Sequence, residues 1–398
     1  MRIDGIQTAK VKPKSETNQQ VHLSSIFMTI RSKEKKSSRV LKIILLSITI
    51  FQGGLTYSVI HKNLTRFQNS NEVNICLWRT LNGIKNMYNY LFLIFGFQWP
   101  YLDQFFSIWS KTDLNNDRET IEFLIKSRRM NRIIVWSLAA INAMTSVLSS
   151  FNFDDPSTWK SFENLSTILF TNLAQSTIQC VIISMIADFL LQVSSHIEAI
   201  FMYVNRNLNS LLVNKNSESL TDKIQQLRQF HFYGEESVRL IDKFLHGYIA
   251  GVYITIVPFM LVGLYRLLYL SSSLVDILFS IFGLFISVSM TSAVTFNAVK
   301  INTVASKYFN VVYELSFADK TFEYYRENSL LMYRMGRHDI GLTFANLFTI
   351  SPSFVTSLLT LCITFVLAFP SIHLPGPIGF LDVFGVNPPN ITHLNSHS

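Results

Sequence analysis

A row of hydroxyl side chains near the C-terminus has a spacing that suits a water-lined path through a membrane. The row consists of Ser353, Ser357, Thr360 and Thr364. They follow one another at i, i+4, i+7 and i+11, so a helix places all four on one face. The opposite face carries Leu, Val, Ile and Phe. Such a stripe could line an ion pore. It could also be a small-residue face packed against another helix, which the spacing alone favours.

The helix that carries this row has recognisable ends. Ser351 and Pro352 predict an N-cap followed by proline at the first helical position. Pro370 stops the helix after Phe369. About 27 Å of helix then remains at ~1.5 Å per residue, just enough to cross a bilayer. The apolar residues 342–350 are expected to form a separate cytosol-side helix or a junction.

Polar and aromatic residues in other apolar segments suggest a small-molecule pocket. The candidates are Asn142, Asn172, Gln175, Gln179 and Tyr265. Amides together with aromatic rings suit such a pocket. Ordinary hydrogen bonds between helices explain any one of these residues at least as well.

Several charged residues also fall inside apolar segments. Arg266 and Asp276 each lie about one turn from the link Ser271–Ser273, so we predict an ion pair across two neighbouring helices and favour it over separate ligand roles. Arg79 and Lys85 are predicted to snorkel outward, and the alternative is that they face a cavity.

Motifs of catalysis are missing from the sequence. It has no His-x-x-x-His with an acid, no Gly-rich phosphate loop and no Ser nucleophile elbow. We therefore predict no enzymatic activity, no metal site and no cofactor. The net charge of +8 comes without zinc-ligand spacing or a basic helix, so a nucleic-acid partner has no support.

The composition indicates a membrane protein. The chain is 49% hydrophobic and 15% charged, against about 25% charged in a typical soluble domain.

Three polar linkers separate some of the apolar runs, and each combines charged residues with the apolar spacing of a helix. They are predicted to continue the helices below the membrane: Ser110–Arg132, Asn205–Lys243 and Lys300–His338. The predicted fold class is an all-α membrane protein with seven transmembrane helices, at residues 40–60, 76–97, 133–151, 165–191, 244–270, 274–299 and 342–369.

Two independent signals orient these spans. Nearly all of the 34 Lys and Arg lie at or before Lys42 or in the three linkers, the exceptions being Lys62, Arg66, Arg79, Lys85, Lys160 and Arg266. Asn63, Asn164 and Asn390 begin Asn-x-Ser/Thr glycosylation sequons, which are modified on the lumenal side. All three lie outside if the N-terminus is cytosolic and the C-terminus is extracellular. This orientation is opposite to that of G-protein-coupled receptors.

The stretch from Leu342 to Phe365 resembles the signature region of insect gustatory receptors. Asn346-Leu347-Phe348 stands where that family has Gly-Leu-Phe, and Thr364-Phe365 stands where it has Thr-Tyr. The Gln-Phe pair of the family would fall at Ser371-Ile372 and does not match. Weaker similarities lie at residues 204–212 and 240–245. Insect odorant receptors share the same architecture.

The resemblance implies a cation-conducting channel opened by a small-molecule tastant. Such a channel is a homo- or hetero-tetramer in the lipid of the plasma membrane of a sensory dendrite. Its last helix lines the pore, with a constriction at Ala368, Phe369 and Ile372, and its tastant binds among the outer halves of the helices. The chain then divides into residues 1–39 (cytosolic segment), 40–299 (six helices with the pocket), 300–341 (cytosolic anchor helices), 342–369 (pore helix) and 370–398 (extracellular tail).

Two alternatives stay open. One is an odorant receptor subunit that needs a co-receptor. The other is a non-conducting, transporter-like protein with seven spans. Transporters more often carry inverted repeats and broken helices, and neither is evident here.

Overall fold

The computed structural model describes residues 36–64, 70–153, 162–213, 220–270, 274–318, 321–337 and 339–368 of the 398-residue chain. Long α-helices dominate these residues: α2 (Lys36–Leu64), α3 (Ser70–Leu91), α4 (Trp99–Lys111), α5 (Arg118–Phe153), α6 (Phe162–Val213), α7 (Leu220–Tyr265), α8 (Leu274–Ser306), α9 (Phe309–Leu315), α10 (Phe322–Met335) and α11 (Pro352–Ala368). Shorter elements are the π-helices η1 (Phe92–Gly96) and η4 (Arg266–Leu270), the 3₁₀-helix η2 (Leu114–Asn116) and the strands β1 (Thr343–Phe344) and β2 (Phe348–Thr349).

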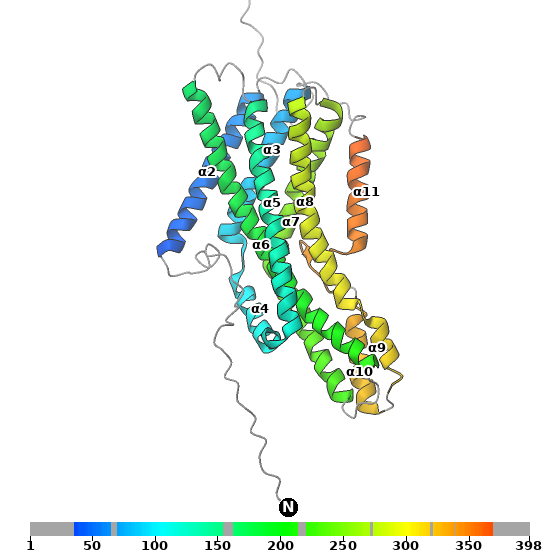
Figure 1. The fold of residues 1–398 in the computed structure, drawn as a ribbon. Helices are drawn as coiled ribbons and strands as arrows, with labels where there is room; N and C mark the ends of the chain where they lie inside the picture. The colour runs from blue at the N-terminus through cyan, green and yellow to red at the C-terminus, as the bar shows by residue number, and fades with distance from the viewer. Residues whose placement is uncertain are drawn as a thin grey trace, which may run out of the picture.

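The helices form an elongated bundle with a smaller lobe at one end (Figure 1). Helices α2, α5, α7 and α11 run toward the upper end of the bundle in this view, and α3, α6 and α8 run back from it. Helix α11 stands at the edge of the bundle. The lower lobe consists of α9, α10 and the adjoining ends of α6 and α7. This alternation of direction is the one that a chain with seven crossings requires.

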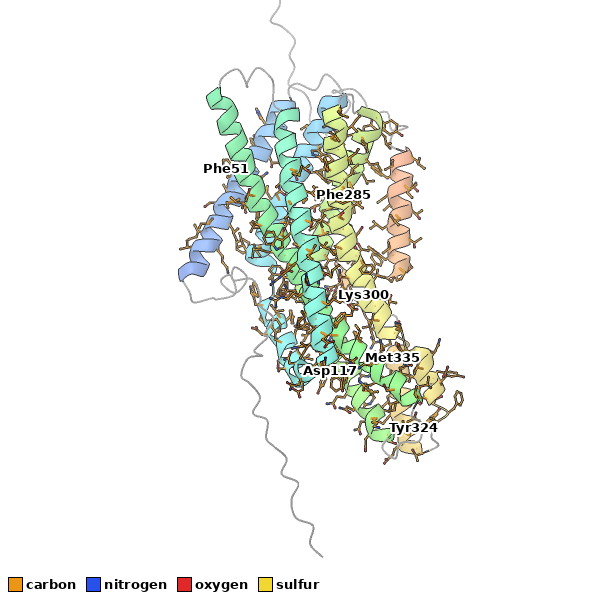
Figure 2. The ribbon with its side chains drawn as sticks, viewed as in Figure 1. Phe51, Asp117, Phe285, Lys300, Tyr324 and Met335 are labelled. Atoms are coloured by element: carbon orange, nitrogen blue, oxygen red, sulfur yellow. The ribbon has the colours of Figure 1, made fainter. Side chains whose placement is uncertain are left out.

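Three helical stretches are long and apolar enough to cross a membrane within the described residues: Val181–Val213, Leu220–Tyr269 and Ser280–Leu315. Two shorter apolar helices are Lys42–Gly54 and Pro352–Ala368. Large apolar side chains lie on the outside of the bundle, as a bilayer permits: Phe51 is 64% exposed and Phe285 is 51% exposed (Figure 2). The number of spans stays a prediction.

The lower lobe has its own core. Tyr324 and Met335 of α10 are completely buried there (Figure 2). They pack with Val204, Leu208, Leu211, Leu220, Ile224, Leu227, Val312, Leu315 and Leu331. The prediction that the linkers continue the helices is confirmed, because α5, α6, α7 and α8 run unbroken between the bundle and these segments.

The segment before the last helix corrects one prediction. Residues 342–351 do not belong to a helix, because strands β1 and β2 form an antiparallel hairpin in which Thr343 pairs with Thr349. Ala345 and Asn346 at its turn have φ of 52° and 59°, a left-handed conformation that does not propagate a right-handed helix. The last helix begins at Pro352, as its N-cap predicts.

Helix α4 was not predicted, and α7 contains a proline. Helix α4 is amphipathic and buries Leu102, Phe105 and Trp109 against the bundle. Its apolar run is too short to stand out as a membrane span. Pro258 lies inside α7 and has no backbone N–H to donate, so it removes one hydrogen bond from the helix.

Candidate functional site

A cavity lies between five helices of the bundle. Its volume of about 50 Å³ is several times what one water molecule requires on the same measure. Helix α7 contributes one face of the lining, with Tyr248, Val252 and Thr255 at i, i+4 and i+7. The remaining lining residues are Lys85, Asn89, Val135, Leu138, Ala139, Asn142, Ile183, Ser184, Ala187, Leu190, Ile256, Ile286, Ser287, Met290 and Val294.

The polar groups of this lining come from every one of the five helices. Lys85 and Asn89 lie one turn apart on α3, Asn142 is on α5, and Ser184 is on α6. The Thr255 hydroxyl donates to the Gly251 carbonyl oxygen at 2.7 Å, and the Ser287 hydroxyl donates to the Gly283 carbonyl oxygen at 2.8 Å. Because those two hydrogens are used within their own helices, α7 and α8 present oxygen lone pairs to the cavity.

Lys85 does not snorkel outward, so that prediction is wrong. Its side chain lines the cavity, and its Nζ lies 4.7 Å from the centre of the Phe259 ring. The Phe259 ring in turn packs against Trp78, with ring centres 3.9 Å apart. The negative face of an aromatic ring attracts an ammonium ion without carrying a net charge. The lysine is therefore held inside the bundle by ring contacts.

The predicted pocket residues have different positions. Asn142 lies in the cavity lining, whereas Tyr265 does not and instead packs on Tyr269 with ring centres 5.1 Å apart. Asn172, Gln175 and Gln179 are in α6, and their side chains lie outside the described residues. Sequence reasoning missed Asn89, Ser184, Tyr248, Thr255 and Ser287, although Lys85 and Asn89 at i and i+4 gave a detectable polar face.

The depth of the cavity also differs from the expectation. Residues 135–142, 183–190, 248–256 and 286–294 lie in those halves of the predicted spans that are nearer the cytosol in the predicted orientation. The resemblance implied the outer halves.

Arg266 is buried at the end of α7, in η4. The side chain of Asp276, its predicted partner, lies outside the described residues, so the ion pair stays a prediction.

Helix α11 carries the hydroxyl row on an uncovered surface. Its N-cap is formed by Ser351, whose hydroxyl accepts a hydrogen bond from the Phe354 backbone N–H at 3.4 Å. No residue of α11 is buried by the rest of the described chain. Within the row, Ser353, Ser357, Thr360 and Thr364 are all exposed, as is Ala368 at the end of the helix. Phe369 and Ile372 lie outside the described residues.

The hydroxyls of α11 also make hydrogen bonds within the helix. Thr360 donates to the Thr356 carbonyl oxygen at 2.9 Å, and Thr364 donates to the Thr360 carbonyl oxygen at 2.8 Å. The threonines of the row therefore present lone pairs, with their hydrogens already used.

Hydrogen bonds between Asp242 of α7 and Thr343 of β1, together called the clasp, attach the hairpin that precedes α11 to α7. The buried Asp242 carboxylate accepts hydrogen bonds from the Thr343 backbone N–H at 2.6 Å and from the Thr343 hydroxyl at 2.8 Å. Beside it, the Tyr253 ring lies 5.9 Å from Phe344 and 5.6 Å from Phe354, centre to centre. Tyr253 follows Val252 of the cavity lining directly. One helix therefore carries both the cavity face and the clasp.

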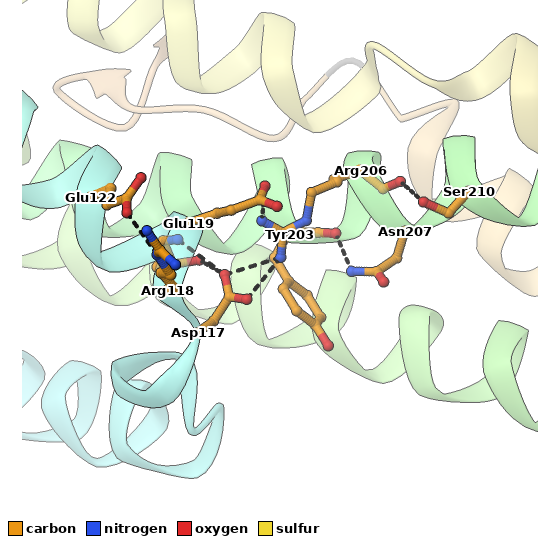
Figure 3. A network of polar contacts seen from close by, with 9 residues as sticks. Asp117, Arg118, Glu119, Glu122, Tyr203, Arg206, Asn207 and Ser210 are labelled. Atoms are coloured by element: carbon orange, nitrogen blue, oxygen red, sulfur yellow. Dashed lines mark hydrogen bonds and ion pairs between the residues drawn. The ribbon is translucent and has the colours of Figure 1, made fainter.

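A second polar network stabilises the junction with the lower lobe. Figure 3 shows Arg206 of α6 between Asp117 and Glu119, and its guanidinium lies 3.0 Å from the Asp117 carboxylate. Partial burial raises the pKa of Asp117. Hydrogen bonds from Thr120 and Arg206 lower this pKa by more than burial raises it, so it ends below its ordinary value. Asp117 thus holds the start of α5 against α6.

The three predicted sequons lie at or beyond helix ends. Asn63 is in the last turn of α2 and Asn164 is in the first turn of α6, and their side chains lie outside the described residues. Asn390 lies outside the described residues altogether.

Comparison with known proteins finds relatives by fold. No known protein-family profile matches the sequence, and no curated protein matches it. The structure of the insect olfactory receptor OR5 from Machilis hrabei in complex with eugenol is similar to this chain with a TM-score of 0.64 and 12% identity, over 89% of this chain and 99% of the receptor. A second structure of the insect olfactory receptor OR5 from Machilis hrabei has a TM-score of 0.57 and 13% identity, over 86% of this chain and 96% of the receptor. This chain therefore has the fold of the insect olfactory receptors, and its predicted resemblance to the insect chemoreceptor superfamily is confirmed at the level of the fold.

Proposed function

We propose that this chain is an insect chemoreceptor, a subunit of a ligand-gated, non-selective cation channel in the plasma membrane. The observation that carries the proposal is the position of α11. It is an apolar helix at the edge of the bundle, its hydroxyl row is uncovered, and no residue of it is buried by its own chain. A helix of this kind reaches its full packing only against further subunits, and a tetramer around a central path would place the hydroxyl row at the path.

The proposed chain crosses the membrane seven times, with its N-terminus in the cytosol. The alternating helix directions and the charge distribution support this arrangement. A small molecule binds in the cavity and shifts the balance between a closed and an open arrangement of α11. The clasp of Asp242 and Thr343 is the route between the two sites, because it joins the cavity-lining helix to the hairpin that precedes α11.

The ligands are proposed to be tastants, on the similarity of residues 342–365 to the gustatory signature. The second candidate is an odorant receptor subunit that requires a co-receptor. The fold similarity to an olfactory receptor favours it. Recording currents from the chain expressed alone and with an odorant co-receptor, across a panel of sugars, bitter compounds and volatiles, separates the two.

Cysteine accessibility tests the pore. Cys362 lies on α11 itself, so the background variant is Cys362→Ala. Ser357→Cys, Thr360→Cys and Thr364→Cys are then introduced singly, with Leu359→Cys on another face of the helix as the matched control. We expect a charged aqueous thiol reagent to block the current at the three row positions, but not at Leu359, while the most active panel compound is present. Equal insensitivity at all four positions would contradict the pore assignment.

A further inference from the structure

We propose that the outer face of α5, at the cytosolic edge of the membrane, binds a phospholipid whose headgroup carries more than one phosphate. The site consists of Lys126, Arg129 and Arg132 for the headgroup, and of Ile133 and Trp136 for the adjoining part of the acyl chains. The proposal rests on the proposed membrane orientation of the chain. It adds a partner that is separate from the ligand of the cavity.

The spacing of these residues places cations and apolar side chains on one face of α5. Arg129 lies four residues before Ile133, and Arg132 lies four residues before Trp136, so each arginine is about one turn from an apolar side chain. Lys126 precedes Arg129 by three residues and extends the same face. No charged residue follows Arg132 in the rest of α5. Arg132 is therefore the last charge before the predicted membrane-spanning stretch.

This face of α5 is open to its surroundings. The side chains of Ile133 and Trp136 are 54% and 57% exposed, and Lys126, Arg129 and Arg132 are exposed as well. Tryptophan is enriched where a membrane meets water, so Trp136 indicates the level of the headgroups. Long cationic side chains reach toward headgroups from such a level while their stems stay on apolar surface. One lipid can therefore contact both parts of the face.

The cations of this face have no carboxylate partner on their own chain. Lys126, Arg129 and Arg132 form no ion pair with any residue that the structure describes. Glu122, one turn before Lys126, is paired instead with Arg118 at 2.9 Å (Figure 3). Like charges one turn apart on a helix repel each other, and Arg129 and Arg132 are such a pair. An anion bound between them would offset this repulsion.

Arg128 lies between these residues in the sequence but belongs to a different contact. It is half-buried, and it interacts electrostatically with Asp188 of α6. The proposed headgroup site therefore excludes it.

The charge and shape of the cations favour a headgroup with several phosphates. The cytosolic leaflet of a plasma membrane is anionic and attracts basic segments that lie next to a membrane span. Lys126, Arg129 and Arg132 together carry more positive charge than a single phosphodiester neutralises. A guanidinium group donates two parallel hydrogen bonds to phosphate oxygens, and two arginines can hold two phosphates in this way.

Native mass spectrometry of the purified full chain in non-ionic detergent tests the proposal, because it counts the bound molecules. Four probes are titrated at neutral pH: a dioctanoyl phosphatidylinositol bisphosphate, dioctanoyl phosphatidylserine, dioctanoyl phosphatidylcholine, and the matching inositol trisphosphate as the free headgroup. The test variant is Arg129→Gln with Arg132→Gln, and its charge-conserving counterpart is Arg129→Lys with Arg132→Lys. Lys111→Gln with Arg118→Gln removes the same charge from exposed positions outside the site and is the matched control.

We expect the bisphosphate lipid to bind more tightly than the serine lipid, and the choline lipid to bind least. The double glutamine variant should weaken binding of the bisphosphate lipid by about tenfold or more, the usual effect of losing charged hydrogen-bond partners. The double lysine variant should have an intermediate affinity, because the charge remains and the fork of donors is lost. The control should bind as the wild type does. Unchanged elution volume and unfolding temperature show that the variants are folded.

The proposal is overturned if the bisphosphate lipid does not bind to the wild-type chain, or if the glutamine variant and the control lose equal affinity. Equally tight binding of the serine lipid would overturn the assignment to several phosphates. Equally tight binding of the inositol trisphosphate would overturn a lipid as the occupant, because the free headgroup does not reach Ile133 and Trp136. None of these results bears on conduction. A chain that binds the lipid through Arg129 and Arg132 but gives no ligand-evoked current would contradict the proposed channel and leave this site standing.

Discussion

Gly251 is a residue whose missing side chain shapes the cavity wall. A Cβ added there would lie 1.9 Å from Cε1 of Tyr88, so no side chain fits while the tyrosine of α3 lies against α7. The Tyr88 hydroxyl donates to the Gly247 carbonyl oxygen on the same helix. Gly251 therefore sets how closely α3 approaches α7, one residue before Val252 of the cavity.

Gly251→Ala is expected to destabilise the protein by about 1–3 kcal/mol, the usual cost of overpacking a core. The matched control is Gly54→Ala in α2, where an added Cβ meets nothing within 4 Å. Because alanine is the better helix former, this control should stabilise the protein by about 0.5–1 kcal/mol. Thermal unfolding in detergent reports both changes, and a shift of the same sign at the two glycines would refute the close packing at Gly251.

At the scale of elements, the hairpin of β1 and β2 lies between α7, which lines part of the cavity, and α11, which carries the hydroxyl row. Asp242 holds its first strand, Thr343 also accepts a hydrogen bond from the Asn346 backbone N–H, and Ile350 donates its backbone N–H to Leu342. The hairpin is therefore stabilised by its own hydrogen bonds and is attached to α7 through Asp242. In the proposed channel, a movement of α7 would reach the start of α11 through this hairpin.

Asp242→Asn and Thr343→Val are each expected to reduce the maximal ligand-evoked current by about tenfold or more. The first variant removes the charge of the acceptor, the second removes the hydroxyl donor, and a hydrogen bond to a charged group is worth roughly 1.5–3 kcal/mol. Ligand binding to the cavity should stay unchanged. The double variant should be no worse than the worse single one, since both act on one contact.

Asp222→Asn, which changes an exposed carboxyl at the other end of α7, is the control for this series. Equal losses of binding and current in the clasp variants would mean that the clasp supports the cavity rather than the coupling.

The sequence predicted some of these elements better than others. Ser351 and Pro352 located the start of α11 correctly, because capping is encoded in neighbouring residues. The hairpin was missed since Ala345 carries no sign of its left-handed conformation. The cavity was only partly predictable: Asn142 was a candidate, but Thr255 and Ser287 are ordinary residues until five helices bring them together. Tertiary packing decides such sites, and a single sequence does not show it.

At the scale of the whole molecule, the chain exposes aromatic surface where a subunit partner would be expected. Phe322 and Tyr333 of α10 are 78% and 72% exposed, although the lobe that they cover has a complete core of its own. Apolar surface of this kind outside a membrane marks an interaction site. These side chains and the uncovered α11 are the surfaces that the proposed subunit assembly would cover.

If the proposed tetramer forms through α10, Tyr333→Asp is expected to shift the purified protein from tetramer toward monomer, because a carboxylate buried at an apolar interface would lack a partner. Native mass spectrometry measures the distribution of species. Val213→Asp, at an equally exposed position at the end of α6, should leave the distribution unchanged. A tetramer that survives Tyr333→Asp would place the subunit contact elsewhere than on α10.

Pro258 gives α7 two mechanically different parts. Its ring leaves the Ile254 carbonyl without its usual helical donor, so bending is easiest near this level. Before it, the helix from Leu220 to Val257 is uninterrupted and carries all the α7 residues that line the cavity, together with Tyr253 and Asp242. In the proposed channel, a ligand that displaces this wall would act on an unbroken helix on the side of Asp242 and on a helix that lacks one hydrogen bond beyond Pro258. Bending of α7 would then be easiest beyond Pro258, and the displacement of the wall would be passed mainly toward the hairpin.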